Sequence, residues 1–140
     1  MRTEEFVEKA RVVFERHPEV SCAYLFGSLA HRRGGALSDI DLAIYRDPAY
    51  RPVESGWYTY WGELHSELVR ELGLRDDDVD LVILNDVKSS LLAHRATWKG
   101  RLILCRDPRS RVALETGILR QYLDAAPLRC LLAQSLRQPA

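Results

Sequence analysis

Two aspartates separated by one residue, Asp39 and Asp41, stand at the head of an apolar run that reaches Tyr45. Side chains two apart on a strand point to the same face, so these carboxylates are expected roughly 6.6 Å apart along it. That spacing lets both carboxylates coordinate one hard divalent cation, or a pair of cations about 3.5–4 Å apart. The sequence therefore indicates a carboxylate site for a divalent metal.

An apolar segment ending in Gly27-Ser28 precedes this pair by ten residues. A tight turn at that point would leave backbone N–H groups pointing at an anion. His31, Arg32 and Arg33 follow the turn, and their positive charge suits the oxygens of phosphate groups. Metal-binding carboxylates beside an anion-binding turn indicate phosphate chemistry.

A third acidic residue, Asp80, is embedded in an apolar strand predicted over 79–84. A charge in such a strand needs a partner or a metal. If this strand neighbours the strand over 39–45, Asp80 joins Asp39 and Asp41. Three packed carboxylates repel one another and persist around cations, and Mg²⁺ is the natural cation for oxygen ligands. Two metals would then neutralise a nucleoside triphosphate, while Asp80 orients or deprotonates an attacking hydroxyl.

The scaffold that must position these residues alternates between helical and strand periodicity. The pattern predicts strands over 21–26, 39–45, 79–84 and 102–105, and helices beginning near Thr3, Trp57, Ser89 and Pro108. Ile40, Leu42 and Ile44 should face the core, on the face opposite Asp39 and Asp41. The expected fold class is α/β (α+β), a mixed sheet of about four strands flanked by helices. Residues 1–140 should form one domain, with 126–140 as a C-terminal helical extension.

Composition limits the function further. Lys plus Arg and Asp plus Glu number 20 each, and this zero net charge argues against a dedicated nucleic-acid surface. No apolar run approaches membrane-spanning length, so a cytoplasmic protein is expected. Cys22, Cys105 and Cys130 are far apart and suggest neither a zinc site nor a disulfide framework. We expect buried free thiols in a reducing cytosol.

The order Gly27-Ser28, ten residues, Asp39-x-Asp41 matches the signature of the polymerase-β-type nucleotidyltransferase superfamily, and Val-Asp80-Leu-Val resembles its third-carboxylate strand. The small size and the elements after Asp80 look like the minimal nucleotidyltransferases. More narrowly, the layout of roughly residues 20 to 125 is similar to the antitoxin paired with a HEPN-domain ribonuclease toxin.

The resemblance implies a nucleotidyltransferase fold that uses ATP with Mg²⁺ and transfers AMP to a tyrosine hydroxyl of a HEPN toxin, which blocks its RNase activity. It implies a hetero-oligomer of this chain with the toxin. Carried onto this sequence, the catalytic and metal-binding residues are Asp39, Asp41 and Asp80, and the nucleotide-binding residues are Gly27, Ser28, Arg32 and Arg33. Members commonly carry Gly-Ser-x-Ala-Arg-Gly, whereas here extra residues precede Gly34, so the basic side chain that reaches the phosphates stays open.

Two other functions remain open at this stage. The chain could neutralise a partner by binding alone, with a retained but unused site. It could also modify a small molecule such as an aminoglycoside, although enzymes of that kind usually need an added domain to hold the acceptor. A template-independent RNA polymerase is disfavoured by the zero net charge.

Overall fold

The computed structural model describes residues 3–27, 39–52 and 56–137. The helices are α1 (Thr3–Glu15), α2 (Gly56–Leu72), α3 (Ser90–Thr97), α4 (Pro108–Asp124) and α5 (Ala126–Arg137). The strands are β1 (Val20–Phe26), β2 (Ile40–Arg46), β3 (Val79–Ile83) and β4 (Arg101–Cys105). The predicted strands and helices are all present, with ends that differ by one or two residues.

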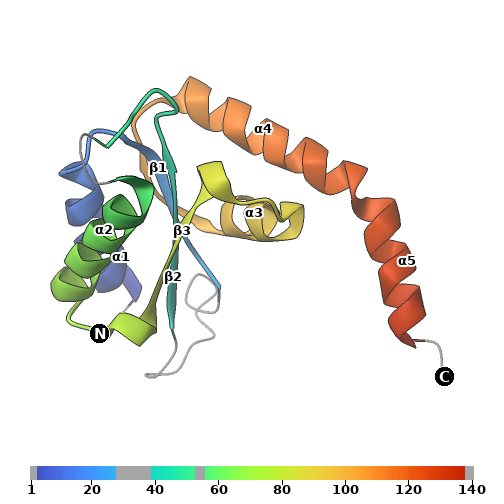
Figure 1. The fold of residues 1–140 in the computed structure, drawn as a ribbon, viewed down its shortest axis with the longest axis horizontal. Coiled ribbons are helices and arrows are strands. Elements are labelled where there is room, and N and C mark those ends of the chain that lie inside the picture. Colours follow the sequence, from blue (N-terminus) through green and yellow to red (C-terminus); the bar gives the residue numbers. More distant parts are fainter. Residues whose placement is uncertain (1–2, 28–38, 53–55, 138–140) are drawn as a thin grey trace.

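The four strands form one mixed sheet in the order β3-β2-β1-β4. β1 runs antiparallel to both β2 and β4, and β2 runs parallel to β3. Two parallel neighbours need a crossover connection, which α2 provides. Figure 1 shows α1 and α2 on one side of the sheet and α3 on the other. The predicted mixed α+β fold is confirmed.

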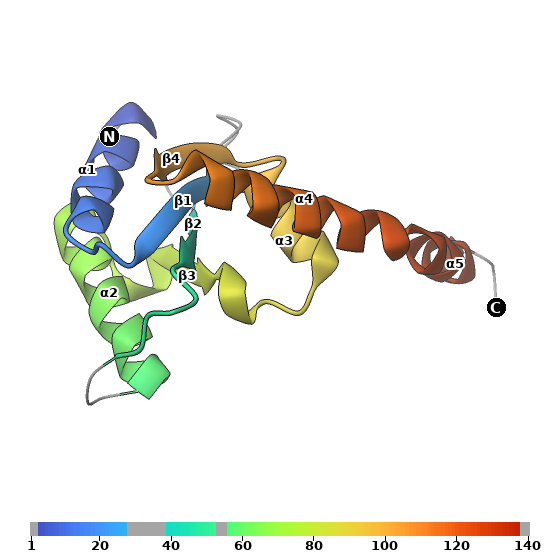
Figure 2. The ribbon, with the colours of Figure 1, turned by 90° about the horizontal axis from the view of Figure 1, so that it is seen from above.

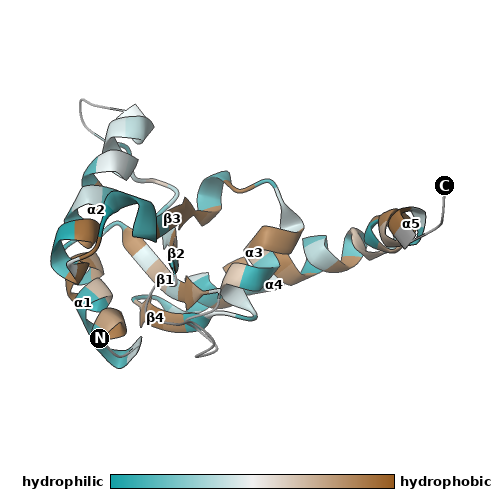
Figure 3. Cartoon of the chain, turned by 90° about the horizontal axis from the view of Figure 1, so that it is seen from below, coloured by the Kyte–Doolittle hydropathy of each residue, from teal (hydrophilic) through white to brown (hydrophobic). Residues whose placement is uncertain are grey.

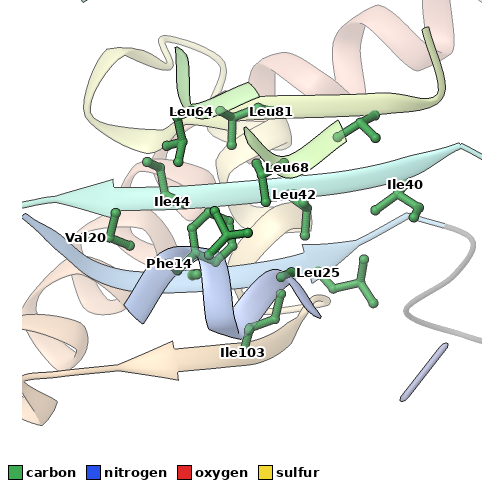
Figure 4. Packing of buried hydrophobic residues seen from close by; sticks show 14 of the residues in the cluster. Phe14, Val20, Leu25, Ile40, Leu42, Ile44, Leu64, Leu68, Leu81 and Ile103 are labelled. Carbon is green, nitrogen blue, oxygen red and sulfur yellow. The ribbon is translucent and has the colours of Figure 1, made fainter. Parts of the chain in front are cut away.

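The main core lies between the sheet and the pair α1 and α2 (Figure 4). Ile40, Leu42 and Ile44 of β2 all point into it and are at most 1% exposed. Phe14 of α1 and Leu68 of α2 pack against them, also fully buried. The strict alternation of apolar residues along β2 therefore assigns this face correctly, and it leaves Asp41 on the opposite face.

A second, smaller core covers that opposite face, where α3 and α4 lie (Figure 2). Tyr24 of β1 and Ala43 of β2 are buried there with Ala96 of α3. The Tyr24 hydroxyl donates a hydrogen bond of 2.9 Å to the carboxylate of Glu115 in α4. Two helices on each face explain why the central strands are buried on both sides.

Local sequence signals fix several helix ends. Ser89 caps α3, because its hydroxyl accepts a hydrogen bond from the Leu92 backbone N–H. Asp107 caps α4 by accepting from the Arg109 N–H, with Pro108 in the first turn. Both caps confirm the helix starts expected from the sequence.

The predicted third strand ends one residue too late, because β3 stops at Ile83 and Leu84 begins a short 3-10 turn. The Asn85 side chain explains this. Its amide accepts from the Arg46 N–H and donates to the Arg46 carbonyl, each at 3.0 Å. A side chain thus takes the place of the backbone ladder where β3 would otherwise continue beside β2.

β3 is one of the two outer strands of the sheet, and α2 covers its backbone. The Trp61 indole N–H donates to the Leu81 carbonyl at 2.8 Å, and His65 Nε2 lies 2.7 Å from the Val79 carbonyl. The two rings stack with their centroids 4.8 Å apart. Since a carbonyl oxygen only accepts, Nε2 of His65 must carry the proton.

The C-terminal end of α4 and all of α5 extend away from the sheet (Figures 1 and 2). Brown, hydrophobic positions are visible on α5 in Figure 3. Four leucines of α5 are 56–88% exposed: Leu128, Leu131, Leu132 and Leu136. Within the described residues, no helix is both long and apolar enough to cross a membrane.

The three cysteines are free thiols. Cys22 is buried, Cys105 is partly buried and Cys130 is exposed. The expectation of buried thiols is therefore correct for Cys22 and wrong for Cys130, which lies on the projecting helix α5.

Candidate active site

Asp41 and Asp80 are direct partners across the parallel strands β2 and β3. Residues in register on neighbouring strands point their side chains to the same face, so the two carboxylates lie side by side. This approach of Asp80 to Asp41 was expected if β2 and β3 are neighbours, and they are. Asp39 immediately precedes β2 and is exposed to solvent.

The environment of Asp41 disfavours its charged form and raises the pKa of this carboxyl to about 6. Burial is the main cause, followed by a hydrogen bond and charge repulsion from Asp80 and by the charge of Asp39. The nearby Arg95 guanidinium acts in the opposite direction. A partly desolvated carboxylate with two acidic neighbours is an arrangement that a bound cation would stabilise.

Gly27 directly follows β1 and lies against the Asp41 carboxylate. Its φ of +78° is in the left-handed region that favours glycine. A Cβ atom at this position would overlap Oδ2 of Asp41. Glycine is therefore required here both for backbone conformation and for the close approach of the turn to the carboxylate.

A cleft of about 380 Å³ opens where β1 ends and β2 and β3 begin. Asp41, Asp80 and Gly27 form part of its lining, and the apolar part includes Trp61 and Leu92. The volume is within the range of small-molecule sites, which commonly combine apolar walls with a few convergent polar groups. The cleft thus joins the acidic pair and the glycine turn in one concave surface.

Arg95 of α3 also lines the cleft and lies close enough to influence Asp41. Sequence reasoning missed this residue, because it lies in an ordinary helical pattern 54 positions after Asp41. Only the packing of α3 across the sheet brings its charge to the cleft. Its cationic side chain beside two carboxylates is suited to the phosphate groups of a nucleotide.

The other predicted nucleotide-binding residues, Ser28, Arg32 and Arg33, lie outside the described residues. Their predicted roles remain predictions, as does any contact of His31 with phosphate.

The donor set of the acidic pair fits a hard cation such as Mg²⁺. Asp41 and Asp80 provide oxygen ligands, and burial and the acidic neighbours Asp80 and Asp39 raise the pKa of Asp41. Within residues 3–27, 39–52 and 56–137, no cluster of three or more His, Cys, Asp or Glu side chains forms a ready metal site. The structure therefore brings two of the three predicted ligands together and leaves exposed Asp39 beside them.

A larger groove, about 660 Å³, runs along the outer side of α2. Of the charged residues that line it, Arg16 and Glu67 form an ion pair at 3.0 Å. It has no counterpart to the closely spaced carboxylates of the smaller cleft, so we assign the chemistry to the smaller one.

Comparison with known proteins gives a family match. Residues 8–109 match the family model described as polymerase beta, nucleotidyltransferase. These residues include Gly27, Asp39, Asp41, Asp80 and Arg95. No curated protein sequence matches the chain.

Solved structures share the fold over nearly the whole chain. One is a toxin–antitoxin crystal structure with AMP-PNP, at TM-score 0.71 and 21% identity, covering 99% of this chain and 100% of the other. A second is a tri-AMPylated Shewanella oneidensis HEPN toxin in complex with its MNT antitoxin, at TM-score 0.69 and 20% identity, covering 97% and 99%. With the family match extending over both strands of the acidic pair, this chain belongs to the polymerase β nucleotidyltransferase family.

Proposed function

We propose that this chain transfers AMP from ATP to a tyrosine hydroxyl of a HEPN-domain toxin and thereby acts as its antitoxin. The observation that carries the proposal is the placement of Asp41 and Asp80 in register, beside Gly27, in one cleft. The likeness to chains of toxin–antitoxin complexes, one of which contains an AMPylated HEPN toxin, supports the choice of acceptor.

Asp39, Asp41 and Asp80 are the residues that we assign to Mg²⁺, which when bound would offset the negative charge of the triphosphate. Gly27 and Ser28 are assigned to the phosphates through their backbone. Among the described residues, Arg95 is the cationic side chain that lines this cleft, and it would attract the same phosphates. Arg32 and Arg33 are further candidates for this contact.

The transfer forms one bond and breaks one. The tyrosine oxygen attacks the α-phosphorus of ATP, and the bond from this phosphorus to the bridging oxygen of pyrophosphate breaks. Asp80 is exposed on the outer strand and can accept the proton of the attacking hydroxyl. Arg95 offsets charge that develops on the departing pyrophosphate. The products are the AMP-tyrosine ester and pyrophosphate.

The acceptor in this proposal is a folded protein, so transfer requires a complex between this chain and the toxin. ATP is abundant in the cytoplasm, and we place the reaction in that compartment.

Intact-protein mass spectrometry tests the proposal directly. The chain is incubated with ATP, Mg²⁺ and a HEPN protein encoded beside it, and the partner should gain mass in whole AMP units on tyrosine. Asp80→Asn should abolish the gain, whereas Asp77→Asn, which changes an exposed carboxylate in the turn before β3, should not.

Size-exclusion chromatography of the same mixtures distinguishes the alternative of binding alone. A stable complex without any mass gain would replace the transfer proposal with neutralisation by binding. Modification of an aminoglycoside in place of the protein would assign the site to small-molecule transfer.

A further inference from the structure

Cys22 of β1 and Cys105 of β4 face each other across two antiparallel strands. The adjacent pair in this register is Ser21 and Arg106, and the Arg106 N–H donates to the Ser21 carbonyl at 2.9 Å. Hydrogen-bonded and non-hydrogen-bonded pairs alternate along an antiparallel ladder. The two cysteines therefore form a non-hydrogen-bonded pair, the kind in which cross-strand side chains lie closest.

This geometry suits a covalent bond between the two sulfurs. The Cα atoms of a non-hydrogen-bonded pair are about 4.5 Å apart, which is inside the range of about 4.4–6.8 Å found for disulfides. Both side chains point to the face packed by α4, where both belong to the smaller core. Closure thus needs rotation of side chains and little movement of the backbone.

The two thiols differ in access. Cys22 is fully buried in the smaller core, and Cys105 is partly exposed at its margin. Burial raises the pKa of Cys22 to about 12, with Cys105 adding to the effect, so Cys22 remains a neutral thiol at physiological pH. An oxidant from solvent therefore meets Cys105 first.

The charged and titratable groups around the pair come from α4 and β1. Arg111 lies near both cysteines, and it is paired with Glu115 at 3.1 Å. Glu115 also accepts the hydrogen bond of the Tyr24 hydroxyl.

We propose that Cys22 and Cys105 form a two-cysteine oxidation site that reacts with hydroperoxides and closes to a cross-strand disulfide. The Cys105 thiol gives up its proton to solvent, and its sulfur attacks the terminal oxygen of the hydroperoxide. The O–O bond breaks, a sulfenic acid forms, and the departing alkoxide takes up a proton and leaves as an alcohol, or as water if the oxidant is hydrogen peroxide. The Cys22 sulfur then attacks the Cys105 sulfur and expels its oxygen, which leaves as water with the Cys22 proton. Two thiols are oxidised, and one peroxide is reduced.

The disulfide would tie β1 to β4 across 82 intervening residues (105 − 22 − 1), which include β2, β3, α2 and α3. Neither cysteine lines the acidic cleft among the described residues, so the bond forms whether or not the chain transfers AMP. In a reducing compartment such a bond is transient and is reopened by a dithiol reductant.

Mass mapping of thiols tests the proposal. Fully reduced protein is treated with stoichiometric hydrogen peroxide, denatured, alkylated with N-ethylmaleimide and digested. The untreated chain should take three labels, and the oxidised chain should take one, on Cys130, with a linked peptide pair containing Cys22 and Cys105. Oxidation should also raise Tm by roughly 5–10 °C, reversibly with dithiothreitol.

Variants keep the test specific. Cys130→Ser should leave both the linkage and the Tm rise intact, because this thiol is on α5. Cys105→Ser should prevent the Tm rise and leave Cys22 open to alkylation after denaturation. If Cys105→Ser does not fold, Cys22→Ala with dimedone trapping of a sulfenic acid on Cys105 reports the first step instead.

Two results would overturn the proposal. The first is full alkylation of Cys22 in oxidised, denatured wild type, whether Cys105 is untouched or has advanced to a sulfinic acid. The second is a disulfide that joins Cys105 only to another molecule.

Discussion

The Asp41 carboxylate occupies the space in which any residue other than glycine at position 27 would carry its Cβ atom. The turn after β1 and the acidic residue of β2 are therefore matched to each other. This contact links the glycine of the sequence motif to its aspartate by simple steric exclusion, and it leads to the first prediction.

Gly27→Ala should lower AMP transfer roughly 100-fold, because the added methyl group displaces Asp41 from its position. It should also lower the free energy of unfolding by about 1–2 kcal/mol through the left-handed φ. Gly73→Ala is the matched control, since Gly73 has a φ of +69° with open space at its Cβ. It should show the loss of stability and normal transfer, measured by urea unfolding and by mass spectrometry.

Asp41→Asn should abolish transfer and yet stabilise the metal-free protein. The raised folded pKa, about 6, means that folding favours protonated Asp41, so its contribution is greatest at low pH and is lost as the pH rises through about 6. Asparagine removes the unfavourable charge. Urea unfolding in EDTA should show a gain of about 1–2 kcal/mol at pH 7.5 and little gain near pH 4.

The wild type and Asp41→Asn also test whether the cation binds at Asp41. Added Mg²⁺ should raise the Tm of wild type at pH 7.5 and leave that of Asp41→Asn nearly unchanged. Equal stabilisation of both proteins by Mg²⁺ would show that the cation binds at a place other than Asp41.

Arg95→Ala should lower kcat/KM for ATP roughly 10- to 100-fold, the effect expected when a charged contact to phosphate is lost. Arg95→Lys should recover part of this activity. Lysine keeps the positive charge but cannot donate the two parallel hydrogen bonds of a guanidinium group. Lys99→Ala serves as control, since Lys99 is exposed and does not line the cleft. Unchanged kinetics in Arg95→Ala would show that Arg95 does not contact the phosphates of ATP.

His65→Leu should destabilise the chain by about 1–3 kcal/mol. The substitution leaves the Val79 carbonyl, on a residue that is 2% exposed, without its ring donor. His65→Gln keeps an N–H donor and should lose less. Chemical unfolding at neutral pH measures both, and an equal loss in the two variants would assign the effect to packing against Trp61.

Charged substitutions on α5 should cost little. Leu131→Lys and Leu132→Lys change side chains that are already 56–61% exposed, so the free energy of unfolding should stay within about 0.5 kcal/mol. Ile118→Lys in α4 is the contrast, because Ile118 is 7% exposed and its substitution should cost about 3 kcal/mol. Differential scanning fluorimetry can compare the three. A large loss in the α5 variants would mean that these leucines pack against the chain in solution.

The sequence was informative wherever one local rule dominated. Alternation along β2 assigned Ile40, Leu42 and Ile44 to the core, and the pattern of an aspartate before a proline placed the start of α4. The spacing of Gly27 and Asp41 also indicated that these two residues belong together. These signals are local, and the fold preserves them.

Other features depend on packing that no local pattern records. That β2 and β3 are neighbours was only a condition of the prediction, and the crossover through α2 brings them together as a parallel pair. Arg95 reaches the cleft because α3 lies across the sheet, and Cys22 meets Cys105 because β1 pairs with β4. In each case the contact joins segments that are far apart in the chain.

The ring donors along β3 limit how another protein can approach Asp80. An open sheet edge commonly recruits partners by strand addition, in which a foreign backbone bonds to the outer strand. Here the carbonyls of Val79 and Leu81 already accept from His65 and Trp61. In the proposed transfer, the acceptor hydroxyl would therefore reach Asp80 on a side chain and not on an added strand.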